Sequence, residues 1–252
     1  MLNQILEKKR EEVQSLNIPE RKQVSERSFF SALKQSKRKP ALIAEVKKAS
    51  PSKGVIKESF HPVEIAKAYE AGRADCLSVL TDETFFQGHR DYIAQIKEVV
   101  SLPVLRKDFI IDHKQIIESS HIGADAVLLI GEALDPVLLH ELYVHAGELN
   151  LDVLVEVHSL PVLEKLLPHF TPKILGVNNR DLTTFQTDIH QIEKISEAVP
   201  KETLLVSESG IFTFSDVETV KSKGADAILV GESLMREENQ TSAIQRLYGE
   251  TK

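Results

Sequence analysis

Short apolar runs alternate with amphipathic segments from residue 41 to the end of the chain. The apolar runs predict eight strands, at 41–47, 75–81, 104–107, 126–130, 153–157, 174–178, 204–208 and 227–230. The segments between them, such as PVEIAKAYEAG and SDVETVKSKG, have helical periodicity, and several end in the glycine that commonly follows a helix. Regular alternation of this kind predicts parallel strands that helical crossovers connect.

Eight strand–helix units close a (βα)8 TIM barrel, a fold that typically needs about 250 residues. An open, doubly wound sheet would show the same local pattern. A weak internal repeat favours closure: GADAVLLIGEAL at 123–134 is echoed by GADAILVGESL at 224–234, half a barrel away, and more loosely by GRADCLSVLT at 72–81. The sequence therefore predicts an α/β protein with a single barrel domain over 41–252.

Residues 1–40 precede the barrel and form a predicted helical extension that breaks near Pro19 and resumes as a short helix around 29–33. Its first helix has an apolar stripe, made of Leu2, Ile5, Leu6 and Val13. We expect the extension to pack near the upper rim of the barrel, at the carboxyl ends of the strands. There the second helix would help to close a substrate pocket.

Composition and charge argue against several classes of binding partner. The 252-residue chain has a formal net charge of −7 and no basic patch, which argues against nucleic acid. The charged N-terminus lacks the apolar core of a signal peptide, and no apolar run approaches the roughly 20 residues that cross a bilayer. We expect a cytoplasmic protein with no membrane partner. Cys76 is the single cysteine, which excludes an intrachain disulfide and a cysteine-rich metal site.

The common metal and nucleotide motifs are missing. HELYVH at 140–145 misses the HExxH spacing by one residue, so its two histidines would not share a metal on one helix face. Neither GxxxxGK[ST] nor GxGxxG occurs. The nine histidines are scattered, and we interpret each of them as a surface or core residue.

Polar residues gather where the predicted strands end, which is where this fold places its chemistry. Strand side chains alternate faces, so Glu45 and Lys47 point the same way. For the same reason Lys107 lies on the same face as Leu105, and Glu156 lies on the same face as Leu154. A buried charge must be paired or face a ligand. Convergence of such groups favours an active site over an isolated structural ion pair. The remaining members of the set are Asn178, Arg180, Glu208, Ser209, Gly210 and Gly231.

The segments SESGI and VGESL predict a phosphate site. Loops after the seventh and eighth strands commonly bind phosphate in this fold. Backbone N–H groups of Ser209–Gly210 and Gly231–Glu232 would face the anion, and the Glu232 carboxylate would have to turn away from it. The alternative is that these glycines only permit tight turns.

The run LIAEVKKASPSKGVI resembles the signature of the indole-3-glycerol-phosphate synthase family, an enzyme family of tryptophan biosynthesis. The resemblance continues through LTDETFFQG, VLRKDFI, LVEVH, GVNNRDL, VSESGI and LVGESLM, and it covers nearly the whole chain. It implies a cytoplasmic (βα)8 lyase that decarboxylates 1-(2-carboxyphenylamino)-1-deoxyribulose 5-phosphate and closes its indole ring. It implies no metal and no organic cofactor. Its partner is a phosphorylated small molecule, and we expect a monomer or a weak homo-oligomer.

The family's functional positions map onto this chain residue by residue. The positions matching its catalytic set are Glu45, Lys47, Lys107, Glu156, Asn178 and Ser209. The positions matching its substrate-binding set are Ser50, Phe86, Phe109, Arg180, Glu208, Gly210, Gly231 and Glu232. The chemistry favours Lys107 as general acid for the ketone, Glu156 as the group that tunes it, and the Glu45–Lys47 pair for dehydration. Which lysine serves which step stays open.

Two other functions fit the pattern less well. Phosphoribosylanthranilate isomerase is a related phosphosugar barrel, but its family uses a cysteine base on the first strand, where this chain has Glu45 and Lys47. A non-catalytic phosphate-binding barrel would be expected to have lost rim residues, and none is lost here.

Overall fold

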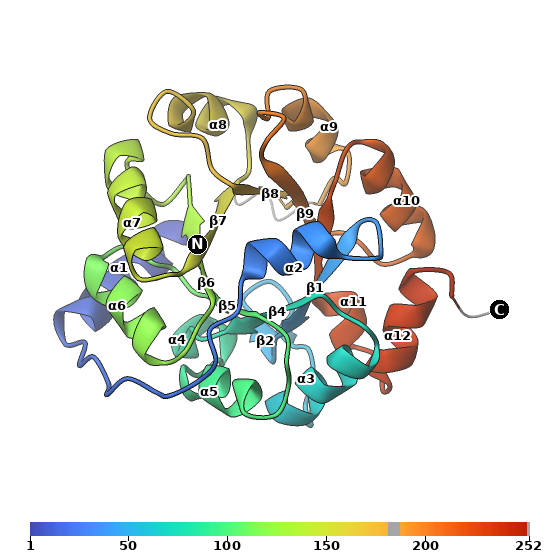
Figure 1. Cartoon of the computed structure of the whole chain (residues 1–252), viewed down its shortest axis with the longest axis horizontal. Helices are drawn as coiled ribbons and strands as arrows, with labels where there is room; N and C mark the ends of the chain where they lie inside the picture. Colours follow the sequence, from blue (N-terminus) through green and yellow to red (C-terminus); the bar gives the residue numbers. More distant parts are fainter. Residues whose placement is uncertain (181–186, 251–252) are drawn as a thin grey trace.

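Eight parallel strands form a closed barrel in the computed structural model, which describes residues 1–180 and 187–250. Around the barrel the strands follow the order β1-β10-β9-β8-β7-β6-β5-β4, and helices surround them on the outside (Figure 1). The predicted (βα)8 fold is therefore confirmed. The barrel strands are β1 (Ala41–Val46), β4 (Cys76–Leu80), β5 (Val104–Lys107), β6 (Ala126–Ile130), β7 (Asp152–Val157), β8 (Ile174–Asn178), β9 (Leu204–Glu208) and β10 (Ala227–Val230).

Helices follow every barrel strand within the described residues. They are α3 (Pro62–Ala71), α4 (Glu83–Phe86), α5 (Asp91–Lys97), α6 (His113–His121), α7 (Pro136–Glu148), α8 (Leu160–Leu166), α9 (Gln191–Ser196), α10 (Phe214–Ser222), α11 (Glu232–Met235) and α12 (Gln240–Leu247). Side-chain hydrogen bonds cap the N-termini of several of these helices. The Asp112 carboxylate, for example, accepts a hydrogen bond from the Lys114 N–H at the start of α6. None of the described helices is both long and apolar enough to span a membrane.

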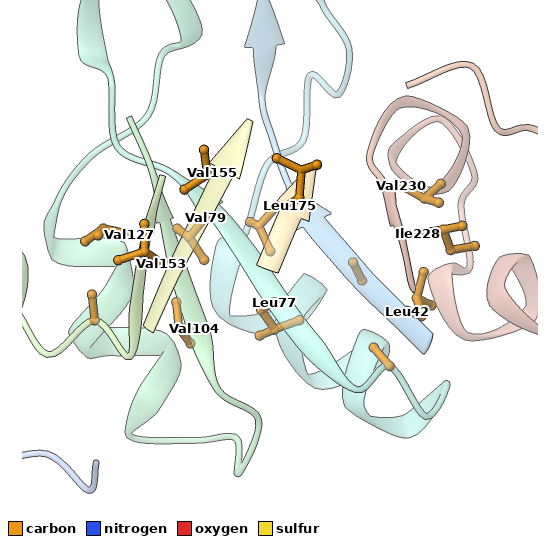
Figure 2. Close-up of a cluster of buried hydrophobic side chains, with 14 of the residues drawn as sticks. Leu42, Leu77, Val79, Val104, Val127, Val153, Val155, Leu175, Ile228 and Val230 are labelled. Atoms are coloured by element: carbon orange, nitrogen blue, oxygen red, sulfur yellow. The ribbon is translucent and has the colours of Figure 1, made fainter. Parts of the chain in front are cut away.

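The strands are apolar on both faces because both faces are buried. Outward-facing side chains such as Leu42, Val155 and Val230 pack between the barrel and its helices (Figure 2). Inward-facing ones such as Ile43, Leu105 and Leu154 fill the barrel interior. This two-sided burial explains why the strands read as continuous apolar runs rather than as alternating patterns.

The internal repeat has a structural cause at the amino ends of the strands. Each repeat contains an aspartate just before its strand, and this carboxylate accepts a hydrogen bond from a backbone N–H of the preceding neighbour in the barrel. The bonds run to Asp75 from Leu42 (2.8 Å), to Asp125 from Val104 (2.9 Å) and to Asp226 from Leu205 (2.9 Å). The repeated aspartates therefore fasten neighbouring strands together at the floor of the barrel, the end opposite the site.

The second helix of the extension, α2 (Phe29–Gln35), closes that floor. Phe29 and Leu33 are fully buried against interior residues of the lowest layer, including Ile43 and Cys76. The backbone N–H of Phe30 also donates to the Asp152 carboxylate at the start of β7 (2.9 Å). Our expectation that this helix would close the substrate pocket is wrong. Its two large apolar side chains fill the bottom of the barrel, and Figure 1 shows α2 lying across that end of the barrel.

The first helix, α1 (Leu2–Gln14), lies at the opposite end. Met1, Leu2 and Ile5 line the cavity at the carboxyl ends of the strands. The extension thus covers both ends of the barrel, and the part near the site is α1. The β1–α3 loop also contributes there through a small antiparallel hairpin, β2 (Ala49–Ser50) and β3 (Gly54–Val55), with Gly54 at φ +65°.

Candidate active site

All fourteen site residues named from the sequence line one cavity at the upper rim. Strand alternation explains the convergence: Glu45 on β1, Lys107 on β5, Glu156 on β7 and Glu208 on β9 each follow an inward-facing apolar residue two positions earlier. Asn178 ends β8, and the other nine residues lie in the segments between the ends of the strands and the main outer helices, where Ser50 belongs to β2, Phe86 to α4 and Glu232 to α11. Asp181 and Leu182 of the GVNNRDL motif lie outside the described residues.

Lys107 is the centre of the charged groups. Its ammonium Nζ lies 2.8 Å from Glu156 Oε2 and 3.3 Å from Glu208 Oε2. Burial by itself would lower the pKa of Lys107, but the charges of Glu156, Glu208 and Glu45 raise it well above its usual value. Lys107 therefore stays protonated at neutral pH, with two carboxylates in contact with one ammonium.

The two carboxylates differ in their surroundings. Burial would raise the pKa of Glu156, but Lys107 and His158 hold it well below its usual value. For Glu208, burial and the neighbouring Glu156 outweigh Lys107 and raise its pKa to about 8. Among the described residues, Glu208 Oε1 is buried without a hydrogen-bond partner. Glu156 is therefore the carboxylate that stays ionised beside Lys107, whereas the surroundings of Glu208 favour its neutral form.

A glycine makes room for the Glu208 carboxylate. A Cβ at Gly176 on β8 would lie only 2.1 Å from Glu208 Oε1. Gly231 does the same for Glu45, because a Cβ there would lie 2.5 Å from Glu45 Oε1. Each glycine faces the interior beside an acidic strand end, so each permits a carboxylate to lie across the neighbouring strand.

Glu45 and Lys47 form a second, separate pair. Lys47 Nζ lies 2.5 Å from Glu45 Oε1, and the Ser78 hydroxyl donates to Glu45 Oε2 at 3.4 Å. The Lys47 side chain is more exposed than that of Glu45, at 18% against 5%, since it lies just past the end of β1. The pair thus presents a partly exposed ammonium and a buried carboxylate to the cavity.

The loops after β9 and β10 meet at one side of the cavity. Ser209 and Gly210 both have left-handed backbone angles, at φ +68° and +78°. The carboxylate of Glu232 is held by cations: Oε1 accepts from Arg236 Nε (3.0 Å) and Nη2 (2.9 Å), and Lys53 Nζ lies 3.7 Å away. Its charge is therefore compensated beside the predicted phosphate site.

An apolar wall faces these loops across the cavity. The rings of Phe86 and Phe109 lie 6.1 Å apart between centroids and are tilted by 38°. Ser50 of the hairpin, Leu128 and Ile130 of β6 also line the cavity. A flat apolar group on one side and charged groups on the other suit a ligand that carries both an aromatic ring and a phosphate.

Two functional residues were not predicted from the sequence, one in the cavity and one beside it. We interpreted His158 as a surface or core residue, but it lines the cavity, and its Nε2 lies 3.0 Å from Glu156 Oε1. The alternation that singled out Glu45 and Lys47 applies equally to Glu156 and His158, which are also two residues apart.

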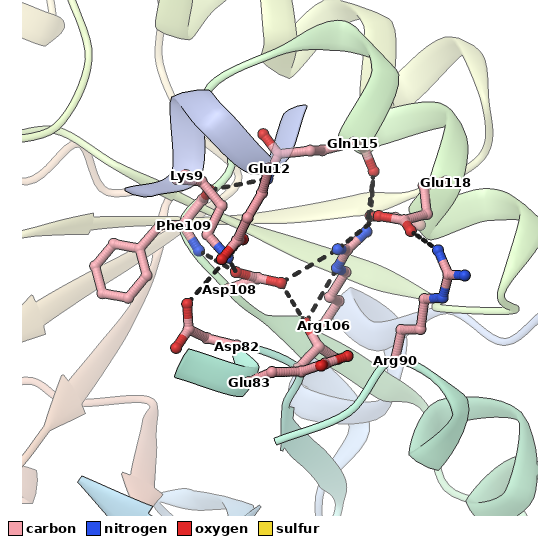
Figure 3. A network of polar contacts seen from close by, with 12 residues as sticks. Lys9, Glu12, Asp82, Glu83, Arg90, Arg106, Asp108, Phe109, Gln115 and Glu118 are labelled. Atoms are coloured by element: carbon pink, nitrogen blue, oxygen red, sulfur yellow. Dashed lines mark hydrogen bonds and ion pairs between the residues drawn. The ribbon is translucent and has the colours of Figure 1, made fainter. Parts of the chain in front are cut away.

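Lys9 of α1 is the other missed residue. It takes the position in the apolar stripe of α1 between Ile5 and Val13, and it is buried. Its Nζ lies 2.9 Å from Asp82 Oδ2, 2.9 Å from Asp108 Oδ1 and 2.7 Å from Glu12 Oε2 (Figure 3). Asp108 directly follows Lys107 in the sequence, so this network ties α1 to the strand end that carries the central lysine.

The network continues away from the cavity through Arg106. Its guanidinium pairs with Asp108 (3.2 Å) and Glu118 (2.7 Å), and Glu118 also binds Arg90 (2.7 Å; Figure 3). Although burial would raise the pKa of Asp108, Arg106 and Lys9 lower it to about 2. Asp108 is therefore ionised at neutral pH, and the ion pairs of this cluster anchor α1, β5 and α6 to one another.

No three His, Cys, Asp or Glu side chains among the described residues are arranged to hold a metal ion.

Comparisons with known proteins agree with this geometry. A family model described as indole-3-glycerol phosphate synthase matches residues 2–247. The indole-3-glycerol phosphate synthase of Priestia megaterium is 64% identical over 251 residues, which are 100% of this chain and 98% of that protein. That of Bacillus pumilus is 58% identical over 250 residues, which are 99% of this chain and 100% of that protein.

More distant solved structures share the fold. An N-acetylmannosamine-6-phosphate 2-epimerase from Clostridium perfringens has a TM-score of 0.64 at 13% identity, covering 91% of this chain and 99% of its own. A thiamine phosphate pyrophosphorylase from Pyrococcus furiosus has a TM-score of 0.61 at 18% identity, covering 83% and 94%. At these identities the likeness concerns the fold alone.

Proposed function

Because the chain belongs to the indole-3-glycerol phosphate synthase family, we propose a division of that family's reaction among the residues of the cavity. The protein is a decarboxylating lyase of tryptophan biosynthesis. It converts 1-(2-carboxyphenylamino)-1-deoxyribulose 5-phosphate into indole-3-glycerol phosphate, carbon dioxide and water. The observation that carries the division of roles is the contact of one ammonium, Lys107, with two buried carboxylates, Glu156 and Glu208.

Lys107 is the proposed general acid of ring closure. The ring carbon that bears the carboxylate attacks the ketone, a carbon–carbon bond forms, and the carbonyl oxygen gains electrons that a proton must neutralise. Lys107 is protonated at neutral pH and supplies that proton, and Glu156 at 2.8 Å orients the ammonium and helps to restore its proton. Loss of carbon dioxide then leaves an electron pair on the ring carbon, and aromaticity returns.

The Glu45–Lys47 pair is proposed to complete the dehydration. The new hydroxyl leaves as water when it is protonated, while the adjacent carbon loses a proton and the second ring of the indole becomes aromatic. A carboxylate and an ammonium 2.5 Å apart offer one base and one acid for these two transfers. In the alternative assignment, Lys47 serves ring closure and Lys107 serves dehydration. The Lys107 variant described in the Discussion distinguishes the two assignments.

The aromatic ring and the phosphate of the substrate are assigned to opposite sides of the cavity. The tilted rings of Phe86 and Phe109 are proposed to hold the aromatic ring of the substrate, together with Ser50 of the hairpin. The phosphate is assigned to the backbone of Ser209, Gly210 and Gly231, with Arg180 and Asn178 between the two sides. Cys76 cannot serve as a base for a rival isomerase reaction, since it is buried at the floor against Phe29.

The protein is expected to produce indole fluorescence from this substrate. The chain contains no tryptophan, so the product would appear against a low background. Incubation of the purified protein with the substrate, followed by fluorescence, tests the activity directly. A folded protein that releases neither indole product nor carbon dioxide would contradict the proposed roles.

A charge change tests the phosphate assignment. Glu232→Gln removes a negative charge beside the proposed phosphate site and releases Arg236 and Lys53 to attract the anion. Inorganic phosphate should compete with substrate, and its inhibition constant should fall by about two- to fivefold in the variant. Glu141→Gln, at an exposed position of α7, is the matched control and should leave the constant unchanged. Non-competitive inhibition, or weaker inhibition of the Glu232 variant, would refute the assignment.

We also propose that the protein works in the cytoplasm as a monomer or weak homo-oligomer. All fourteen site residues come from one chain, so the cavity needs no second copy for completion. Its single cysteine is unpaired, as is usual in reducing compartments. Light scattering after size-exclusion chromatography tests the oligomeric state.

A further inference from the structure

His158 is placed between two groups that only accept hydrogen bonds. Its Nε2 lies 3.0 Å from Glu156 Oε1, and its Nδ1 lies 2.8 Å from the backbone carbonyl oxygen of Arg180. A neutral imidazole has one N–H and can satisfy only one of these acceptors, whereas an imidazolium satisfies both. The side chain is only 7% exposed, so there is little room for solvent to replace a missing bond. The geometry therefore favours the charged form.

The charged groups around His158 come from three elements. Glu156 lies on β7, Glu132 follows β6 and accepts the His158 backbone N–H at 2.8 Å, and Arg180 follows β8. Lys107 is on the far side of the Glu156 carboxylate. Burial would lower the pKa of His158, but the hydrogen bond and charge of Glu156, with the charge of Glu132, raise it to about 9.

Glu156 is consequently held by three donors. Oε1 accepts from His158 Nε2 and from Asn178 Nδ2 (3.2 Å), and Oε2 accepts from Lys107 Nζ (2.8 Å). Loss of the His158 bond would leave Asn178 as the donor to Oε1. The carboxylate could then rotate, and it would lose a neighbouring positive charge.

We propose that His158 is a positioning residue of this active site: its imidazolium clamps the Glu156 carboxylate between β7 and the segment after β8, and so keeps Glu156 ionised and aimed at Lys107. This inference rests on the proposed roles of Lys107 and Glu156. By stabilising the carboxylate, His158 makes Glu156 a weaker base toward the Lys107 proton. The proton therefore remains on Lys107 until the substrate carbonyl needs it.

The direction of the pH effect follows from the charges. A nearby cation lowers the pKa of a carboxylate, so removal of the imidazolium should raise the pKa of Glu156. The acid side of the kcat profile, where Glu156 becomes protonated, should then move to higher pH. The wild-type profile should also fall above about pH 9 as His158 loses its proton and one of its two hydrogen bonds.

The variant His158→Gln tests the inference because glutamine keeps a neutral donor without the charge. We expect kcat to fall about ten- to hundredfold, KM to change less than about threefold, and the acid limb to move up by about one pH unit. His169→Gln is the matched control, since His169 is exposed in the turn before β8 at the floor end. A lower melting temperature with an unmoved acid limb would make His158 merely structural and overturn the proposal.

A measurement on the wild-type protein tests the inference even if the His158 variant does not fold. Nuclear magnetic resonance of protein with nitrogen-labelled histidine reports how many ring nitrogens of His158 carry a proton. Two protonated nitrogens at pH 7 are expected, and a neutral ring at that pH would overturn the proposal. Indole formation by the wild-type protein is scored separately, so failure of the proposed function and failure of this inference give different results.

Discussion

Replacing Lys107 with methionine is expected to lower kcat by about 10² or more, equivalent to at least ~2.7 kcal/mol of activation free energy. Methionine keeps most of the apolar stem and removes the charge. An ammonium that acts chiefly in the transition state contributes to the chemical step more than to binding, so KM should change much less than kcat. Steady-state kinetics with the fluorescent product measure both constants.

The same substitution separates catalysis from scaffolding. Lys107→Met removes the ammonium from both carboxylate partners, Glu156 and Glu208, and burial with the nearby Glu156 favours the neutral form of Glu208. Glu156 retains His158 and Asn178 as donors, so the variant should fold. Lys173→Met, an exposed lysine before β8, is the control for the chemical change itself. A Lys107→Met protein that melts early yet turns over normally would transfer the acid role to Lys47.

Replacing Lys9 with methionine is expected to lower the free energy that holds α1 on the barrel by about 3–5 kcal/mol, the usual cost of removing one partner of a buried ion pair. Asp82 Oδ2 would face a methyl group, and Asp108 would keep Arg106, Thr81 and the backbone N–H of Phe109. Native-state hydrogen exchange of the α1 amides measures this opening directly. Because Met1, Leu2 and Ile5 line the cavity, KM for substrate should rise as α1 detaches.

The neighbouring lysine provides the control for this experiment. Lys8 lies on the same helix, its side chain is 44% exposed, and its ion-pair partner among the described residues is Glu11 at the surface. Lys8→Met should therefore leave both exchange and KM near their wild-type values. Wild-type exchange rates in the Lys9 variant would show that the apolar stripe alone holds α1 in place.

Local rules predicted the barrel and most of the charged rim. The apolar runs identified the eight strands because strands buried on both faces have few polar residues to obscure the pattern. Alternation then put Glu45, Lys107 and Glu156 on the inner face without any knowledge of their partners. The contacts among them required the closed barrel, since Lys107 and Glu208 are 101 residues apart in the sequence.

The errors arose where long-range packing decides the outcome. Phe29 and Leu33 show that α2 has an apolar face, but nothing local says which end of the barrel that face covers. Lys9 interrupts an apolar stripe, which a surface lysine could also do, and its buried partners come from β4 and β5 loops more than 70 residues away. His158 was detectable by alternation and was missed because histidine is common in both cores and active sites.

The two-ended extension has a consequence for how the newly made protein matures. Residues 1–40 leave the ribosome before the barrel does, yet their docking sites are synthesised much later: the Arg27 N–H binds Asp125 and the Phe30 N–H binds Asp152, 98 and 122 residues further on. The apolar face of α2 stays exposed until β7 has emerged, and that of α1 stays exposed until Asp82 and Asp108 have been synthesised. Contacts so distant in sequence form slowly. The nascent extension is thus the segment that a chaperone would be expected to shelter, and its docking would complete both the core and the active site.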